Sequence, residues 1–100
     1  QRLILLVAEM IKNGFLQQVS YDAVDTFSSA RKQFLMLKAI ITFYHKAEEL
    51  VKKGISIAEL HELPVYAQIS RMKQRYSEND LDKLEELPQK VSDALAEIEL

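Results

Sequence analysis

Two aromatic residues, Phe15 and Tyr21, stand apart from the helical hydrophobic pattern of this 100-residue chain. They flank a predicted turn that follows the first helical segment. An aromatic ring in such a place can stack on a planar base or on a partner, or it can pack into the core. The residue types and their positions leave both interpretations open.

The polar clusters offer little catalytic chemistry. His45 and Glu49 are four residues apart on a predicted helix, a spacing that suits a surface ion pair better than a metal site. The carboxylate pairs Glu48–Glu49 and Glu85–Glu86 fall on predicted solvent faces, where nothing would raise a pKa for acid–base work. We therefore predict no catalytic residue and no metal site.

Motifs that bind nucleotides or nucleic acids are missing or weak. The chain has two glycines, Gly14 and Gly54, too far apart for a phosphate-binding loop or a dinucleotide fingerprint. Arg71, Lys73 and Arg75 are close enough for a phosphate contact, but residues two apart on a helix point in different directions. We interpret them as a solvated helix end. The formal net charge of −2 supplies no broad field that would attract nucleic acid.

Composition favours a helical domain. With no cysteine, the chain has neither a disulfide scaffold nor thiolate ligands. Hydrophobic residues make up 48%, and two glycines and two prolines are too few for a β-protein with many turns. No apolar run reaches the roughly 18 to 20 residues that would span a bilayer. Residues 77–100 hold 2 Lys/Arg against 8 Asp/Glu, which we interpret as the solvated face of a terminal helix.

Hydrophobic periodicity predicts how these residues are positioned. Residues 2–18 form a helix, residues 19–27 form an ordered connecting loop, and the longest helix runs from about 29 to 53 with Ser28 or Ser29 as its cap. This long helix carries two neighbouring apolar stripes, so we expect it to be covered on two sides. One stripe comprises Phe34, Leu37, Ile41, Tyr44 and Val51, and the other comprises Met36, Ile40, Phe43, Ala47 and Leu50.

The second half of the chain contains clear signals for helix ends. Ser56 and Glu59 have the spacing of a capping box, and Pro64 suits the first position of a helix that ends near residue 75. The apolar stripe of the last segment keeps its phase across Pro88, so we predict one kinked helix there. The expected fold is all-α: a single domain over residues 1–100, a compact bundle of about five helices with a central long helix.

At this level of detail the chain resembles a known family, the C-terminal helical domain of the catalytic A subunit (alpha chain) of archaeal and bacterial V/A-type ATP synthases. The similar segments follow one another in the family's order from about Leu3 to Lys73. They are Phe15-Leu16-Gln17-Gln18, Val24-Asp25-Thr26, Lys32-Gln33-Phe34, Met36-Leu37-Lys38, Phe43-Tyr44, Gly54, Glu62-Leu63-Pro64-Val65 and Ile69-Ser70-Arg71-Met72-Lys73.

The resemblance implies a function in a rotary, ion-translocating ATPase or ATP synthase. The domain would couple ATP hydrolysis or synthesis to rotation of the central stalk, and Phe15 and Tyr21 would form the adenine side of the nucleotide pocket. The parent subunit would use ATP or ADP with Mg²⁺, whereas the chain alone would bind no cofactor and be inactive. Because the chain starts at Gln1-Arg2 without an initiator Met, we expect a fragment whose nucleotide-binding α/β domain is absent.

The resemblance also implies partners and a location. The partners would be the chain's own nucleotide-binding domain, neighbouring B subunits and the central stalk subunits. The chain would contact no nucleic acid and insert into no membrane, and it would lie in the cytoplasm, peripheral on the inner face of the cell membrane. Two alternatives remain open: a free-standing helical protein–protein interaction module, and a small nucleic-acid binder that uses Arg71, Lys73 and Arg75.

Overall fold

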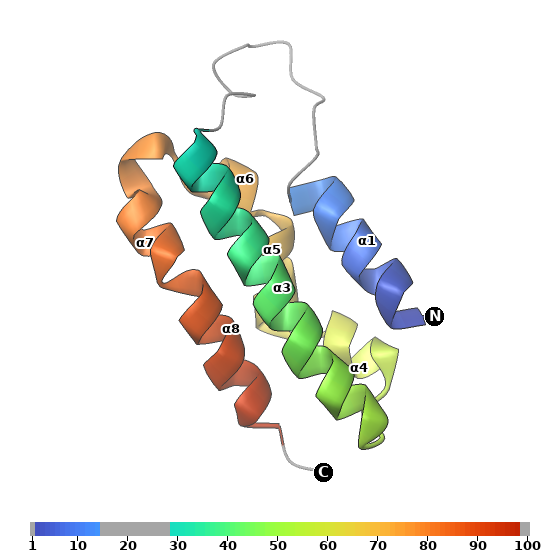
Figure 1. Ribbon diagram of the computed structural model, residues 1–100. Coiled ribbons are helices and arrows are strands. Elements are labelled where there is room, and N and C mark those ends of the chain that lie inside the picture. Colours follow the sequence, from blue (N-terminus) through green and yellow to red (C-terminus); the bar gives the residue numbers. More distant parts are fainter. Residues whose placement is uncertain (1, 15–28, 99–100) are drawn as a thin grey trace.

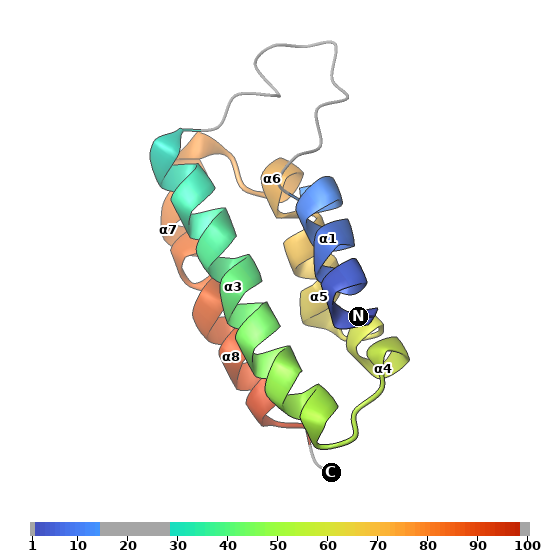
Figure 2. The ribbon, with the colours of Figure 1, turned by 45° about the vertical axis from the view of Figure 1, so that its right-hand side comes forward.

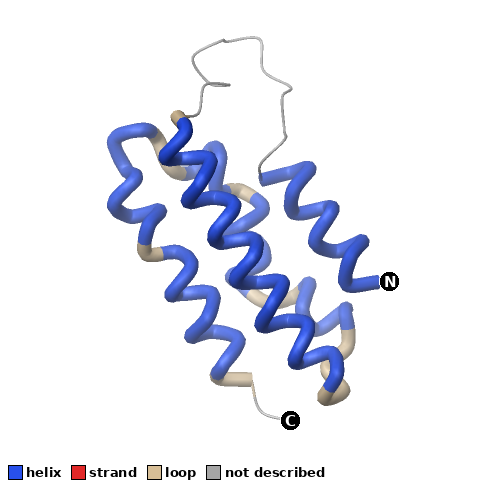
Figure 3. Tube along the Cα trace, in the orientation of Figure 1, coloured by secondary structure: helices blue, strands red, loops and turns tan. Residues whose placement is uncertain are grey.

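Helices make up nearly all of the part of the chain that the computed structural model describes, residues 2–14 and 29–98, and these residues contain no strand (Figure 3). The α-helices in chain order are α1 (Arg2–Gly14), α3 (Ala30–Lys52), α4 (Ile57–His61), α5 (Pro64–Ser70), α6 (Met72–Arg75), α7 (Leu81–Glu85) and α8 (Leu87–Ala96). A short 3₁₀ helix, η1 (Glu78–Asp80), precedes α7. The predicted all-α bundle with one long helix is confirmed.

The helices form two layers that enclose one core (Figures 1 and 2). One layer holds α3, α7 and α8, and the other holds α1, α4, α5 and α6; the most extensive contact between two helices joins α3 to α8. Three α3 residues at the centre of the core, Ala39, Phe43 and Ala47, have no exposed surface. The bundle is elongated, with principal extents of 43 × 25 × 18 Å. The described residues contain no helix that is both long and apolar enough to cross a membrane.

The predicted helix ends are mostly confirmed. The Ser29 hydroxyl caps α3 by accepting the Lys32 N–H at 3.1 Å, and Gly54 follows the helix with a positive φ of 113°, a conformation that favours glycine. The Ser56 hydroxyl accepts the Glu59 N–H at 3.1 Å. The Glu59 carboxylate, however, contacts the Ser56 hydroxyl at 3.2 Å, where the capping-box prediction had it reach the Ser56 N–H.

The later helices are divided more finely than predicted. Pro64 begins α5 as expected, but the helix is interrupted at Arg71, where α6 follows. The kink predicted near Pro88 is a one-residue break at Glu86 between α7 and α8. Buried side chains continue in phase across this break, from Leu84 to Leu87 and Val91, so the two helices act as one bent element against the core.

The expected burial of both apolar stripes of the long helix is half wrong. The stripe with Met36, Ile40 and Phe43 is buried. In the other stripe, Tyr44 and Val51 pack partly against the core, but the side chains in its first half are exposed: Phe34, Leu37 and Ile41. Helical periodicity identifies an apolar face, but it does not identify which neighbour covers that face.

Candidate functional site at the start of the long helix

The described residues provide no catalytic constellation. Across residues 2–14 and 29–98, no group of three or more His, Asp or Glu side chains is placed to hold a metal ion. His45 and Glu49 are both exposed on α3, and Glu85 and Glu86 are exposed at the α7–α8 break. These exposed side chains are not enclosed in a pocket that could hold a substrate against them.

The two predicted adenine-side residues, Phe15 and Tyr21, lie outside the described residues. The points at which their segment joins the fold are described: α1 ends at Gly14, and Ser29 caps α3. Both points lie at the same end of the bundle, beside α6 and the start of α7 (Figure 1). The side chains around Ser29 therefore determine how firmly that end of α3 is anchored.

A carboxylate from the other end of the chain binds the first turn of α3. The Ser29 N–H donates to Glu78 Oε2 at 2.9 Å, across 49 residues of sequence. Hydrogen bonds from the Ser29 backbone and side chain hold the pKa of Glu78 below its ordinary value of 4.5, and the nearby Lys32 charge acts in the same direction. An ionised carboxylate at a helix N-terminus is favoured because the first N–H groups there lack helical acceptors.

Lys32 provides a second and more deeply buried link. Its side chain is almost fully buried, and its Nζ donates to the Lys73 carbonyl oxygen on α6 at 2.9 Å. Burial lowers the pKa of Lys32 and the Lys73 charge lowers it further, while Glu78 opposes both effects. A hydrogen bond that a charged ammonium donates is stronger than one between neutral groups, so this buried link contributes more than an ordinary side-chain hydrogen bond.

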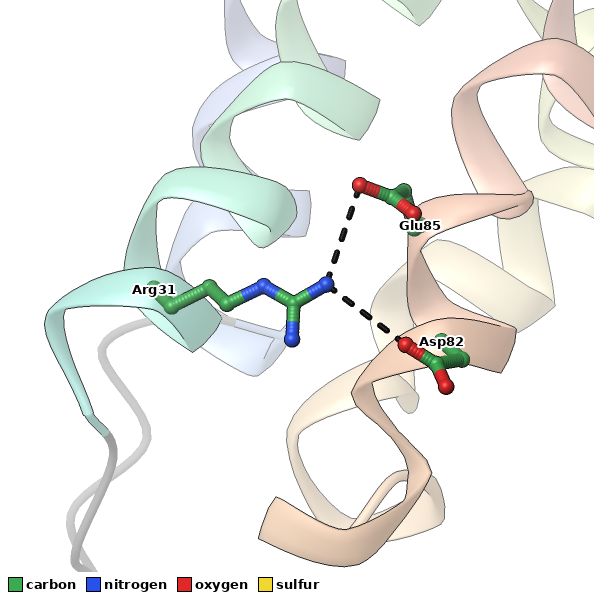
Figure 4. Close-up of polar contacts among 3 residues, drawn as sticks. All are labelled: Arg31, Asp82 and Glu85. Carbon is green, nitrogen blue, oxygen red and sulfur yellow. Dashed lines mark ion pairs between the residues drawn. The ribbon is translucent and has the colours of Figure 1, made fainter.

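Exposed ion pairs complete the connection between α3 and the last segment (Figure 4). Arg31 Nη2 lies 3.6 Å from Asp82 Oδ1 and 3.7 Å from Glu85 Oε2, both on α7. All three side chains are more than half exposed, so each pair contributes about 1 kcal/mol or less. Together these contacts anchor the start of α3 to α6, η1 and α7. The buried and capping hydrogen bonds contribute most of the stabilising free energy.

The basic cluster of the nucleic-acid alternative is not one surface. Arg71 and Arg75 are exposed, but Lys73 is buried, so its interpretation as part of a solvated end is wrong. The Arg75 guanidinium lies 6.0 Å from the centre of the Tyr76 ring. Three cations divided between solvent and the protein interior do not form a continuous phosphate-binding patch.

Sequence reasoning missed Lys32 and Glu78. Lys32 precedes Met36 by four residues and so falls on the buried stripe of α3, a signal that was available from helical spacing. Glu78 carries no comparable signal, because its partner Ser29 lies 49 residues away. The charged residues of the tail are mostly exposed, as predicted, but Glu78, Asp82 and Glu85 also contact the start of α3.

A shallow groove between α1 and α4 was also not predicted. It is lined by Arg2, Leu5, Leu6, Glu9, Ile57, Ala58 and His61. Behind it lies the buried Tyr66, whose ring centre is 4.6 Å from that of His61. Burial raises the pKa of Tyr66 above its ordinary value of 10.0, the Glu9 charge raises it further, and the neighbouring Ser70 hydroxyl partly offsets both effects.

Known proteins match the chain along most of its length. Residues 1–61 match the family described as the C-terminal domain of V and A type ATP synthase. The chain is 40% identical over 93 residues to the V-type ATP synthase alpha chain of Halothermothrix orenii, an alignment that covers 93% of this chain and 16% of that relative. It is 41% identical over 98 residues to the A subunit of the A-type ATP synthase of Methanopyrus kandleri, with 98% and 17% covered. For the corresponding A subunit of Pyrococcus horikoshii the identity is 37% over 98 residues, with 98% and 10% covered.

The relatives are several times longer than this chain. The chain spans 16% and 17% of the length of the first two relatives, so the similarity concerns one domain of a larger subunit. The alignment with the Methanopyrus kandleri subunit covers 98% of this chain, so it includes α1, α3 and the helices from α6 to α8. The chain belongs to the family of C-terminal domains of V- and A-type ATP synthases.

Proposed function

We propose that this chain is the C-terminal helical domain of the catalytic A subunit of a rotary, ion-translocating V/A-type ATPase or ATP synthase. It couples ATP hydrolysis or synthesis, which takes place in a separate nucleotide-binding α/β domain of the same subunit, to rotation of the central stalk. The observation that carries this proposal is the alignment of nearly the whole chain with alpha-chain and A-subunit relatives at about 40% identity.

The mechanical part of the proposal is supported by the construction of the bundle. The long helix α3 is packed along its buried face against α8, α1 and α5, and its first turn is bound to Glu78 and to α6. Closely packed interiors are barely compressible and transmit displacement. When ATP binding closes the nucleotide-binding domain on this bundle, the bundle moves as a stiff body and passes the motion to the stalk.

The nucleotide part of the proposal concerns Phe15 and Tyr21. These residues form part of the adenine side of the pocket, where aromatic rings stack on the base. ATP or ADP with Mg²⁺ is bound by the rest of the parent subunit, and residues 1–100 alone bind neither. Their segment joins α3 at Ser29, which the Glu78 contact holds in place.

The partners and the location of the chain follow from its assignment to a rotary ATPase subunit. The partners are the nucleotide-binding domain of the same subunit, neighbouring B subunits and the central stalk, and the complex lies on the cytoplasmic face of the cell membrane. The alternative, a free-standing interaction module, makes a different genetic prediction. A phosphate-binding loop encoded upstream in the same reading frame supports the ATPase, and an open reading frame that holds this domain alone supports the module.

The experiment that tests the pocket role is the paired substitution Phe15→Ala with Tyr21→Ala in the full-length subunit. Loss of base stacking is expected to weaken nucleotide binding by roughly 1 to 3 kcal/mol, measured by titration calorimetry or nucleotide fluorescence. Tyr44→Ala serves as the control, because Tyr44 is a half-buried aromatic residue of α3 that packs against the core. Unchanged nucleotide affinity in the double variant contradicts a role in the pocket.

A further inference from the structure

Several polar contacts between separate elements converge on the first turn of α3, residues 29–32. The Glu78 carboxylate accepts the Ser29 N–H at 2.9 Å, and the Lys32 Nζ donates to a backbone carbonyl of α6 at 2.9 Å. Arg31 pairs with two carboxylates of α7 (Figure 4). One helical turn is thus held by α6, η1 and α7 together.

Apolar packing already attaches this part of α3 to the core. Directly after the first turn, the side chains of Leu35, Met36 and Ala39 are at most 3% exposed. Apolar burial has no preferred direction, whereas a hydrogen bond requires a defined distance and angle. The polar contacts therefore fix the position of the first turn more precisely than packing alone.

The turn that these contacts fix is the one at which residues 15–28 join α3. The other junction of that segment is Gly14, the last residue of α1, and both junctions lie at the same end of the bundle (Figure 1). In the proposed function this segment carries Phe15 and Tyr21, the residues of the adenine side. A contact that holds Ser29 therefore fixes the point at which the segment ends.

Glu78 acts on this junction itself. Its carboxylate binds the backbone N–H of Ser29, a group that has no helical acceptor at this position. Arg31 and Lys32, by contrast, are held through their side chains and lie further into the helix. An ionised carboxylate forms a stronger hydrogen bond than a neutral acceptor does. Glu78 is also exposed, so its replacement opens no cavity in the core.

We propose that Glu78 is a positioning residue for nucleotide binding. Its bond to Ser29 holds the junction of residues 15–28 in place, so that the nucleotide meets Phe15 and Tyr21 in a binding-competent arrangement and does not have to order them. This inference rests on the proposed function, because it requires these two residues to lie on the adenine side. It adds to the determinants of nucleotide affinity a carboxylate 49 residues after Ser29 in the sequence.

The expected size of the effect follows from the population of the held arrangement. When a binding-competent arrangement is populated for only part of the time, the apparent Kd rises by the inverse of that fraction. Glutamine at position 78 retains an acceptor oxygen but has no charge, whereas alanine has neither. We expect the Kd of Mg²⁺–ADP to rise about threefold in Glu78→Gln and about tenfold in Glu78→Ala.

The test is made on the assembled complex that contains the full-length subunit. Titration calorimetry measures the Kd of Mg²⁺–ADP for the native protein, for the two Glu78 variants and for Glu86→Gln. The last is the matched control, because Glu86 is an exposed glutamate of the same acidic segment, at the break between α7 and α8. Its Kd should equal the native value. The kcat for ATP hydrolysis should stay within about twofold in every variant, because the reaction takes place in a separate domain.

A ligand without the base separates positioning of the adenine side from a general defect. Mg²⁺–pyrophosphate carries phosphates but no adenine, so its Kd is expected to be the same in the native complex and in Glu78→Ala. An equal loss of affinity for ADP and for pyrophosphate contradicts the inference, and so does a lower kcat with an unchanged Kd for ADP. If the alanine variant does not assemble, Glu78→Gln provides the same comparison.

The paired substitution of Phe15 and Tyr21 by alanine, measured beside these variants, separates the two proposals. If the pair weakens Mg²⁺–ADP binding and neither Glu78 variant does, the positioning role is wrong and the pocket role stands. If neither the pair nor the Glu78 variants weaken binding, the pocket role is wrong and the positioning role is wrong with it. Weaker ADP binding in the pair and in both Glu78 variants, with pyrophosphate binding unchanged in Glu78→Ala, supports both.

Discussion

Substitution of Phe43 by alanine tests the arrangement of the core most directly. Phe43 has no exposed surface, lies midway along α3, and its ring centre is 6.1 Å from that of Tyr66 at an interplanar angle of 60°. Loss of a fully buried phenylalanine costs about 3 to 5 kcal/mol, which includes the cavity that the smaller side chain leaves. A domain of this size has a total stability of about 5 to 15 kcal/mol, so the variant retains a marginal fold or loses it.

The matched control is the same substitution nine residues earlier in the same helix. Phe34 is 62% exposed, so Phe34→Ala removes a side chain that is mostly in water. Its effect on the free energy of unfolding is expected to stay within about 0.5 kcal/mol. The two variants share the chemical change and the helix, and they differ in burial.

Urea denaturation of residues 1–100, followed by circular dichroism, measures both variants. With a slope of about 2 kcal/mol per molar urea, a loss of about 4 kcal/mol lowers the midpoint by about 2 M. Phe34→Ala should leave the midpoint almost unchanged. Equal shifts for the two variants, or a loss below about 1 kcal/mol for Phe43→Ala, would refute the assignment of the buried and exposed faces of α3.

Three further predictions concern single side chains. Because the folded pKa of Glu78 is lowered, its ionised form contributes stability above pH 4.5 that is lost as the pH falls through the folded pKa. Glu78→Gln should therefore be less stable than the native domain at neutral pH. A difference in the free energy of unfolding that does not narrow on acidification contradicts this prediction. The pKa of Tyr66 is shifted in the opposite direction, upward, so the pH dependence of stability is reversed. The protonated hydroxyl contributes stability below pH 10.0 that is lost as the pH rises through the folded pKa. Tyr66→Phe should lose less stability than the native domain above pH 10.0, and parallel alkaline denaturation curves would count against it. Ser56→Ala removes the hydroxyl that caps α4 and should cost about 0.5 to 2 kcal/mol in thermal denaturation, whereas Ser92→Ala within α8 should cost nothing or stabilise the domain.

Local signals in the sequence predicted most of the fold. The cap at Ser29, the glycine after α3 and the proline at the start of α5 each act within a few residues, so their effect is readable from neighbours in the chain. The phase of Leu84, Leu87 and Val91 across the helix break was predicted for the same reason.

Long-range features could not be predicted in this way. The bond between Lys32 and the Lys73 carbonyl joins residues 41 apart, and the Glu78 contact at Ser29 spans 49 residues. The hydrophobic period placed Phe34 on an apolar stripe that we expected to be covered, but a period does not identify which neighbour covers a face, and Phe34 is exposed. The aromatic residues Phe15 and Tyr21 were proposed from family resemblance, and their contacts stay a prediction.

The pairing of α3 with α8 has a consequence for synthesis on the ribosome. The main neighbour of the long helix is formed by residues 87–96, which are translated 34 residues after α3 ends. Until that stretch leaves the exit tunnel, the face of α3 that α8 covers lacks its final neighbour. The nascent domain thus exposes an apolar face of α3 until almost its last residues are translated, and a premature stop before Leu87 should yield a protein that is degraded rather than one that is merely shortened.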